Sequence, residues 1–292
     1  MKNRKAFILV VFLSLCSCQG GGVSSSSTST ARSIEASDSA ISSMDSSSVS
    51  SLSDISDSKT TENVESSSGS EKEACFEALS LTVLSGQRFN YYLYSPENRG
   101  ENTPLILYLH GGSGKPQSEE GNLSLLTSGD GLPKFVMDKQ VALDSYIVFP
   151  QLPYGKKGWS DVKDDLFAFL KAVSDELGCN KERISITGHS MGGKGTWDIA
   201  LSYPATFYKV APLSGAVTLS EINVNKLKSK PVWAFVGSDD TIVDPQSSID
   251  FIAALGKIND EAKITVIDGY THFDVPNVYL STEYNLLSWL VE

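Results

Sequence analysis

The chain has 292 residues, of which 40% are hydrophobic and 20% charged, and its formal net charge is −11 at pH 7. Such an acidic chain is poorly suited to the phosphate backbone of nucleic acids, so no nucleic-acid partner is expected. The three histidines lie far apart and show no H-E-x-x-H spacing. The sequence therefore implies no metal site and no cofactor.

Residues 1–18 have the features of an export signal. Three of the first five residues are basic, and a short apolar run follows at 6–15. This run is too short to span a bilayer as a stable helix, but it is typical of a secretory signal. The motif LCSC at 15–18 resembles the bacterial lipobox, which implies that Cys18 is lipidated and anchors the exported chain to the membrane. An ordinary cleaved signal with two incidental cysteines is the alternative.

Residues 19–74 differ in composition from the rest of the chain. Serine makes up 22 of the 47 residues from 24 to 70, and aromatic residues are absent. Such a segment buries too little apolar surface to offset the entropy of ordering it, so we expect a disordered tether. Its reach is roughly 40 Å.

Residues 75–292 suit one large α/β domain. Apolar, β-branched runs between turns predict strands at Arg88–Ser95, Leu105–His110, Tyr146–Pro150, Ile184–Thr187, Lys209–Leu213, Val232–Val236 and Lys263–Ile267. Helical patterns lie at Lys163–Leu177, capped by Asp161 and ended by Gly178, and at Gly193–Tyr203, Pro245–Leu255 and Val278–Leu290. This alternation predicts a mostly parallel, doubly wound sheet with helices on both faces and antiparallel first strands.

The stretch GHSMGGKGTW at 188–197 allows two interpretations. As G-x-x-x-x-G-K it resembles a phosphate-binding loop, but Gly195 stands where that loop needs a serine or threonine after Lys194. As G-x-S-x-G, between a strand and a helix, it places Ser190 on the sharp turn of a nucleophile elbow. The second pattern is complete, and it favours acyl transfer.

An acyl-transfer serine needs a base and an orienting acid. After a nucleophile elbow, the acid comes first along the chain and the histidine base comes second. His272 is the only histidine after Ser190, so it is the expected base. The segment FVGSDDTIVDP offers Asp240 as the acid, with Asp239 as its rival. His189 adjoins the serine, but neighbours along a strand point to opposite faces, so we expect it to pack or support rather than act as base.

The motifs LILYLHGGSG, VFPQLPYGKKGW, ITGHSMGGKGTWDIALSYP, APLSG, FVGSDDTIVDP and GYTHF together resemble the α/β-hydrolase superfamily over residues 88–290. Within it, the chain is similar to dienelactone-hydrolase and prolyl-oligopeptidase-like serine esterases. That resemblance implies an α/β-hydrolase fold and an oxyanion hole made by the N–H groups of Gly112 and Met191, with Gly111 next in line. It also implies a structural role for His110. Trp159, in a loop at the carboxyl edge of the sheet, is a candidate substrate contact or a packing residue.

The substrate is less constrained than the mechanism. An exported, tethered domain with a polar loop at 113–139 favours an ester substrate on a polysaccharide, with acetyl or feruloyl as the acyl group. A prolyl-oligopeptidase-like serine peptidase and a catalytically inactive surface binding module are the alternatives. Cys75 and Cys179 could pair in an exported protein or remain free thiols.

Overall fold

The computed structural model describes residues 73–129 and 131–292. The expected export signal, Cys18 and nearly all of the expected tether lie outside these residues. None of the helices in the described part reaches the length and apolarity that a membrane span requires.

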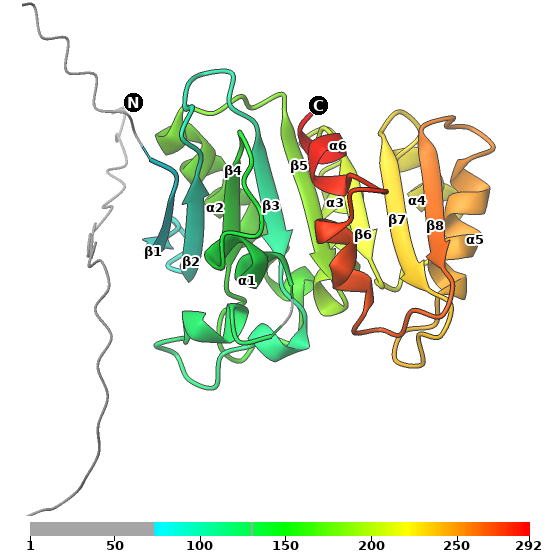
Figure 1. The fold of residues 1–292 in the computed structure, drawn as a ribbon, viewed down its shortest axis with the longest axis horizontal. Helices are drawn as coiled ribbons and strands as arrows, with labels where there is room; N and C mark the ends of the chain where they lie inside the picture. The colour runs from blue at the N-terminus through cyan, green and yellow to red at the C-terminus, as the bar shows by residue number, and fades with distance from the viewer. Residues whose placement is uncertain (1–72, 130) are drawn as a thin grey trace, which may run out of the picture. The chain divides into compact units, whose positions relative to one another are not determined.

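Strands and helices alternate along the described chain, as the sequence pattern predicts (Figure 1). The strands are β1 (Cys75–Thr82), β2 (Arg88–Ser95), β3 (Leu105–Leu109), β4 (Tyr146–Pro150), β5 (Ile184–His189), β6 (Val210–Leu213), β7 (Val232–Gly237) and β8 (Ala262–Ile267). The α-helices are α1 (Leu132–Met137), α2 (Lys163–Leu177), α3 (Met191–Ser202), α4 (Glu221–Lys226), α5 (Gln246–Leu255) and α6 (Leu286–Val291). Short 3₁₀ turns are η1 (Gly112–Gly114), η2 (Leu123–Leu126), η3 (Trp159–Val162) and η4 (Val275–Leu280).

The strands form one sheet in the order β1-β2-β4-β3-β5-β6-β7-β8. The pairs β1–β2 and β2–β4 are antiparallel, and every later neighbouring pair is parallel. This confirms the expected mostly parallel sheet with antiparallel first strands. The carboxyl ends of β3, β4, β5, β7 and β8 therefore share one edge of the sheet, and the loops that leave this edge are the ones that carry the predicted site residues.

Each face of the sheet has its own hydrophobic core, because successive residues of a strand point to opposite sides. On β3, Leu105, Leu107 and Leu109 pack with α2, α3 and α5, whereas Ile106 and Tyr108 pack with α1, η4 and α6. Figure 1 shows α1 and α6 in front of the sheet and the other helices behind it. Burial on both faces explains why the strands read as almost continuous apolar runs.

Three details correct the sequence expectations. Strand β1 was not predicted, because as an edge strand it is buried irregularly. The expected helix at Val278–Leu290 is divided into η4 and α6, since Asn285 adopts the left-handed conformation (φ 49°) that no α-helix accommodates. Asp161 does not cap α2: its carboxylate accepts the N–H of Lys157, and a 3₁₀ turn leads into the helix. Gly178 does end α2, with φ 59°.

The two cysteines of the described chain are both free thiols. Cys75 is half-buried at the start of β1, and Cys179 is buried after α2. Burial raises the pKa of the Cys179 thiol, which makes it less reactive. Of the two alternatives that the sequence leaves open, the structure has the unpaired one.

Candidate active site

Ser190 occupies the turn between β5 and α3 in a strained conformation. Its φ is 60° and its ψ is −119°, a combination that residues other than glycine rarely adopt. The turn is held by the Ser190 N–H, which donates to the carbonyl of Leu213 at 3.0 Å. Strain that is maintained by surrounding contacts is typical of a functional turn, and here it lifts the hydroxyl above the edge of the sheet.

Gly192 shows why the elbow needs glycine. A Cβ at this position would lie 1.8 Å from the carbonyl oxygen of Leu109 and 2.5 Å from its carbon, atoms of the β3 backbone that cannot move aside. The first turn of α3 can therefore approach β3 only where no side chain intervenes. This contact brings the loop after β3 close to Ser190.

Three of the predicted site residues form a hydrogen-bonded chain. The Ser190 hydroxyl lies 2.8 Å from His272 Nε2, to which it donates in the neutral imidazole. On the other side of the ring, Nδ1–H donates to Asp240 Oδ2 at 2.8 Å. The side chains of His272 and Asp240 are almost completely buried. The structure thus brings together side chains that are 50 and 32 residues apart in sequence, in the arrangement that proton transfer from a serine requires.

Asp240, and not its neighbour, faces the histidine. Burial by itself raises the pKa of this carboxyl, but the N–H groups of Val243 and Ile242, both 2.9 Å from Oδ1, and the His272 ring outweigh it. The pKa therefore lies below its usual value, and the carboxylate is charged at neutral pH. Asp239 is exposed to solvent, and its side chain accepts from the Ser238 hydroxyl.

His189 supports the loop of His272. Its Nε2–H donates to the His272 carbonyl at 2.8 Å, and the two rings lie 4.6 Å apart between centroids. Burial lowers the pKa of His189 to about 4, so the ring is neutral at pH 7. This position agrees with the expected supporting role of His189. The sequence predicted that the ring would point away from Ser190, whereas in the structure it contacts the loop of His272 directly.

The loop after β3 lies against the serine. A Cβ built on Gly111 would lie 3.5 Å from Ser190 Cβ, so this loop forms the wall opposite the elbow. In the described chain, no hydrogen bond uses the N–H of Gly112 or that of Met191, the first residue of α3. Free N–H groups at a helix start and in a facing loop are suited to bind a developing oxyanion.

His110 and Trp159 stabilise this loop through hydrogen bonds to its backbone. His110 Nδ1–H donates to the Gly111 carbonyl at 2.6 Å, and its Nε2 accepts the N–H of Leu152 at 2.9 Å. Trp159 Nε1–H donates to the His110 carbonyl at 3.1 Å, and its ring packs edge-on against His110. Of the two roles that the sequence leaves open for Trp159, the structure supports packing: the residue is only 1% exposed, because it fills the space next to Gly195 on α3.

The phosphate-binding interpretation of the same turn does not fit the structure. Gly193 packs against the carbonyl of Leu213, and the Thr196 hydroxyl donates to the Gly192 carbonyl within α3. Lys194 pairs with Asp198 one helical turn further on, at 2.7 Å. None of these groups is arranged to surround a phosphate.

The fold and the site together resemble one class of protein. An eight-stranded sheet with a serine on a strained strand–helix turn is the architecture of α/β-hydrolases, and this chain shares that fold with a solved esterase structure. Residues 151–277 match the model of the Dienelactone hydrolase family, a range that contains Ser190, Asp240 and His272. The proteins that this chain resembles include esterases.

Three known proteins illustrate the likeness. The bifunctional acetylxylan esterase/xylanase XynS20E of Neocallimastix patriciarum is 24% identical over 165 residues, which cover 55% of this chain but only 23% of that protein. The structure of a thermostable esterase is 24% identical, with a TM-score of 0.60 over 74% of this chain and 62% of its own. The feruloyl esterase module from Clostridium thermocellum, complexed with sinapinate, is 15% identical, with a TM-score of 0.56 over 73% of this chain and 88% of its own. At this identity, the structural likenesses show the shared fold.

Proposed function

We propose that this protein is a carboxylic-ester hydrolase in which Ser190 is the nucleophile, His272 the general base and Asp240 the orienting acid. The observation that carries the proposal is the hydrogen-bonded chain from the Ser190 hydroxyl through His272 to the buried Asp240, with 2.8 Å at each step. The expected base and acid follow the serine in the order that this fold uses.

The proposed reaction has two halves. Ser190 Oγ attacks the ester carbonyl while His272 Nε2 takes the hydroxyl proton, and the carbonyl oxygen turns toward the N–H groups of Gly112 and Met191. The bond to the leaving alcohol then breaks, and His272 gives its proton to that alcohol. A water molecule attacks the acyl-enzyme, loses its proton to His272 and releases the acid, and Ser190 regains the proton. Each oxyanion donor typically contributes about 3 kcal/mol to the stability of the transition state.

For the substrate, we propose acetyl or feruloyl esters of polysaccharides. The support is chemical and comparative: the loop after β3 is rich in polar residues, and similar proteins include an acetylxylan esterase/xylanase and a feruloyl esterase module. A peptidase of prolyl-oligopeptidase type and an inactive binding module remain the competing functions. The three-residue hydrogen-bonded chain is unexpected for an inactive module, since a binding module does not need it.

A substrate panel separates these functions. We expect kcat/KM for an acetylated or feruloylated sugar ester to exceed that for a proline-containing peptide amide, because the alcohol of an ester leaves more easily than an amine. The measurement is initial-rate kinetics of the full chain on both substrates, with a long-chain glyceride as a third. A preference for the amide would overturn the esterase proposal, and a preference for the glyceride would overturn the polysaccharide substrate.

We further propose that the protein works outside the cytoplasm, anchored through a lipid on Cys18. The lipobox-like motif and the Ser-rich segment at 19–74 support this proposal. We expect the mature chain to partition with membranes and the Cys18→Ser variant to be released or left unprocessed. Mass spectrometry of the mature N-terminus decides the matter, because an unmodified terminus beyond residue 18 contradicts lipidation. Ser17→Ala keeps the cysteine and is the control.

A further inference from the structure

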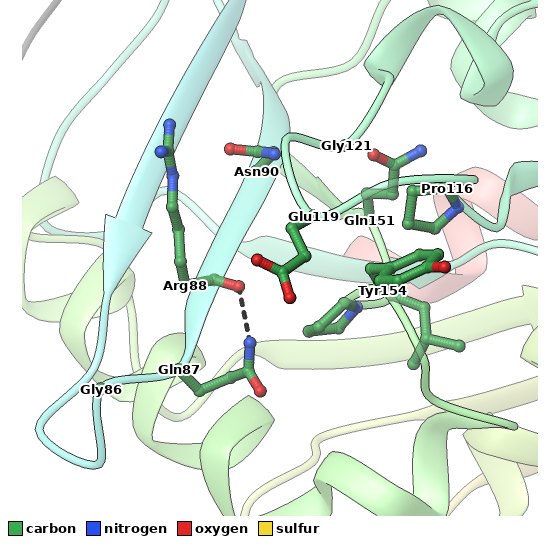
Figure 2. A pocket seen from close by; sticks show the side chains of 11 residues that line it. Gly86, Gln87, Arg88, Asn90, Pro116, Glu119, Gly121, Gln151 and Tyr154 are labelled. Atoms are coloured by element: carbon green, nitrogen blue, oxygen red, sulfur yellow. Dashed lines mark hydrogen bonds between the residues drawn. The ribbon is translucent and has the colours of Figure 1, made fainter.

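A polar cleft of about 300 Å³ lies beside the candidate active site. Three segments line it: the turn before β2 with the start of that strand, the loop after β3 and the loop after β4. Figure 2 shows the side chains of Arg88, Asn90, Glu119, Gln151 and Tyr154 around it. These segments are distant in sequence, so only the sheet order β2-β4-β3 brings them together.

The cleft and Ser190 share a wall. The loop after β3 begins against the serine at Gly111 and continues to Glu119, which lines the cleft. The loop after β4 is tied to the same wall by the N–H of Leu152, which donates to His110 Nε2. Strand β4 is separated from β5, which carries the serine, by β3 alone. The cleft lies over the ends of β4 and β2, two and three strands from β5, so strand spacings place it roughly 10 to 15 Å from the nucleophile, within reach of a substrate that is larger than its ester group.

The cleft is shaped by the protein's own hydrogen bonds. Gln151, which is only 2% exposed, accepts the N–H of Asn122 and donates to the carbonyls of Gly114 and Asn122. Asn90 Nδ2 donates to the carbonyl of Glu120. Gly121, with φ +77°, completes this turn, because a Cβ there would lie 2.4 Å from Asn90 Nδ2. The loop therefore keeps its form without a ligand, which lowers the entropic cost of binding one.

The exposed groups of the cleft match a hydroxyl-rich ligand. In Figure 2 the Glu119 carboxylate points into the space between Arg88 and Tyr154. Tyr154 is 51% exposed, so part of its side chain is accessible to a ligand, while Arg88 Nη2 donates to the Ser80 hydroxyl on β1. A carboxylate accepts hydrogen bonds from sugar hydroxyls, and an aromatic face packs against the C–H groups of a sugar ring. An apolar acyl chain would desolvate Glu119 without a partner, which is unfavourable.

We propose that this cleft is a subsite for sugar residues of the carbohydrate chain that carries the ester. This proposal rests on the proposed ester hydrolysis at Ser190. The subsite holds the polysaccharide while the acylated sugar lies at the serine. It makes the enzyme prefer an ester on an oligosaccharide to the same acyl group on a small alcohol.

Kinetics on two acetyl esters test the subsite. The ratio of kcat/KM for an acetylated xylo-oligosaccharide to kcat/KM for p-nitrophenyl acetate is measured for the full chain. We expect Tyr154→Ala and Glu119→Gln to lower this ratio about tenfold, mainly through KM for the oligosaccharide. Matched controls are Tyr208→Ala and Glu101→Gln, at the opposite edge of the sheet, which leave the ratio unchanged. An unchanged ratio in the cleft variants overturns the subsite but not the ester hydrolysis.

A binding experiment does not depend on turnover. Ser190→Ala, alone and combined with Tyr154→Ala, is titrated with an unesterified xylo-oligosaccharide by calorimetry. We expect the single variant to bind the oligosaccharide, and we expect the double variant to bind it with a Kd that is about tenfold higher. Equal affinity in both variants, no binding in either, or binding of a proline-rich peptide in place of the sugar overturns the subsite. If the wild type hydrolyses no ester but the sugar binds as expected, the proposed function fails and the cleft proposal stands as a carbohydrate site.

Discussion

Replacement of Ser190 or His272 by alanine is expected to lower kcat for ester hydrolysis by about four to six orders of magnitude. Ser190→Ala removes the atom that attacks the carbonyl. His272→Ala leaves the hydroxyl, 2.8 Å from the ring in the native chain, with no base to take its proton. Labelling by a fluorophosphonate, which reacts with activated serines, should be lost in both variants, and circular dichroism verifies that they remain folded.

His189→Ala is the informative control for the histidine. Its ring contacts the His272 carbonyl and is not part of the hydrogen-bonded chain to Ser190, so labelling should weaken without being abolished. If the His189→Ala variant were inactive and the His272→Ala variant remained active, the assignment of the base would be reversed.

The adjacent aspartates are a matched pair for the acid. Asp240→Asn should reduce kcat by roughly 10⁴, since the amide can no longer hold the tautomer of His272 that accepts the serine proton. Asp239→Asn makes the same chemical change one residue earlier, on an exposed side chain, and should have an effect within a few-fold. Turnover of the two variants on one ester is compared, and the opposite order would give the role to Asp239.

The stability of the fold is expected to fall steeply between about pH 6.5 and pH 4. Burial lowers the pKa of both His110 and His189 to about 4, whereas in the unfolded chain a histidine titrates near 6.5. In this window the unfolded chain binds protons that the folded chain excludes, so the free energy of unfolding decreases as the pH falls. The free energy of unfolding is lowered by about 3 kcal/mol per histidine once the pH has fallen to the pKa that the histidine has in the folded chain. Above about pH 6.5 both rings are neutral in either state, and this stabilisation is fully present.

Denaturant unfolding at a series of pH values measures this effect. His110→Gln and His189→Gln offer amide groups near the positions of the ring nitrogens but do not titrate. Each variant should have a smaller pH dependence than the wild type, whatever its stability at neutral pH. An unchanged slope in the double variant would show that other groups cause the acid sensitivity.

Much of the fold could be predicted from local patterns. Seven of the eight strands, the helix α2 with its terminal Gly178 and the elbow at Ser190 follow from apolar runs, helical periodicity and glycine spacing. These features depend on neighbours in the chain, and the parallel sheet follows from their alternation. The edge strand β1 and the break at Asn285 were missed because one is buried only irregularly and the other depends on a single backbone conformation.

By itself, the sequence determined most of the strands, the turn that carries Ser190 and the histidine expected as base, because His272 is the only histidine that follows Ser190. Three features were decided only by the tertiary structure. It placed Asp240, and not Asp239, against His272, and it covered Trp159 with the loop after β3. It also assembled the polar cleft from three separate segments. The physical reason is common to all three. Which of two adjacent carboxylates faces inward, which indole is covered and which loops meet all depend on contacts between residues distant in sequence, and the order of strands in the sheet creates those contacts.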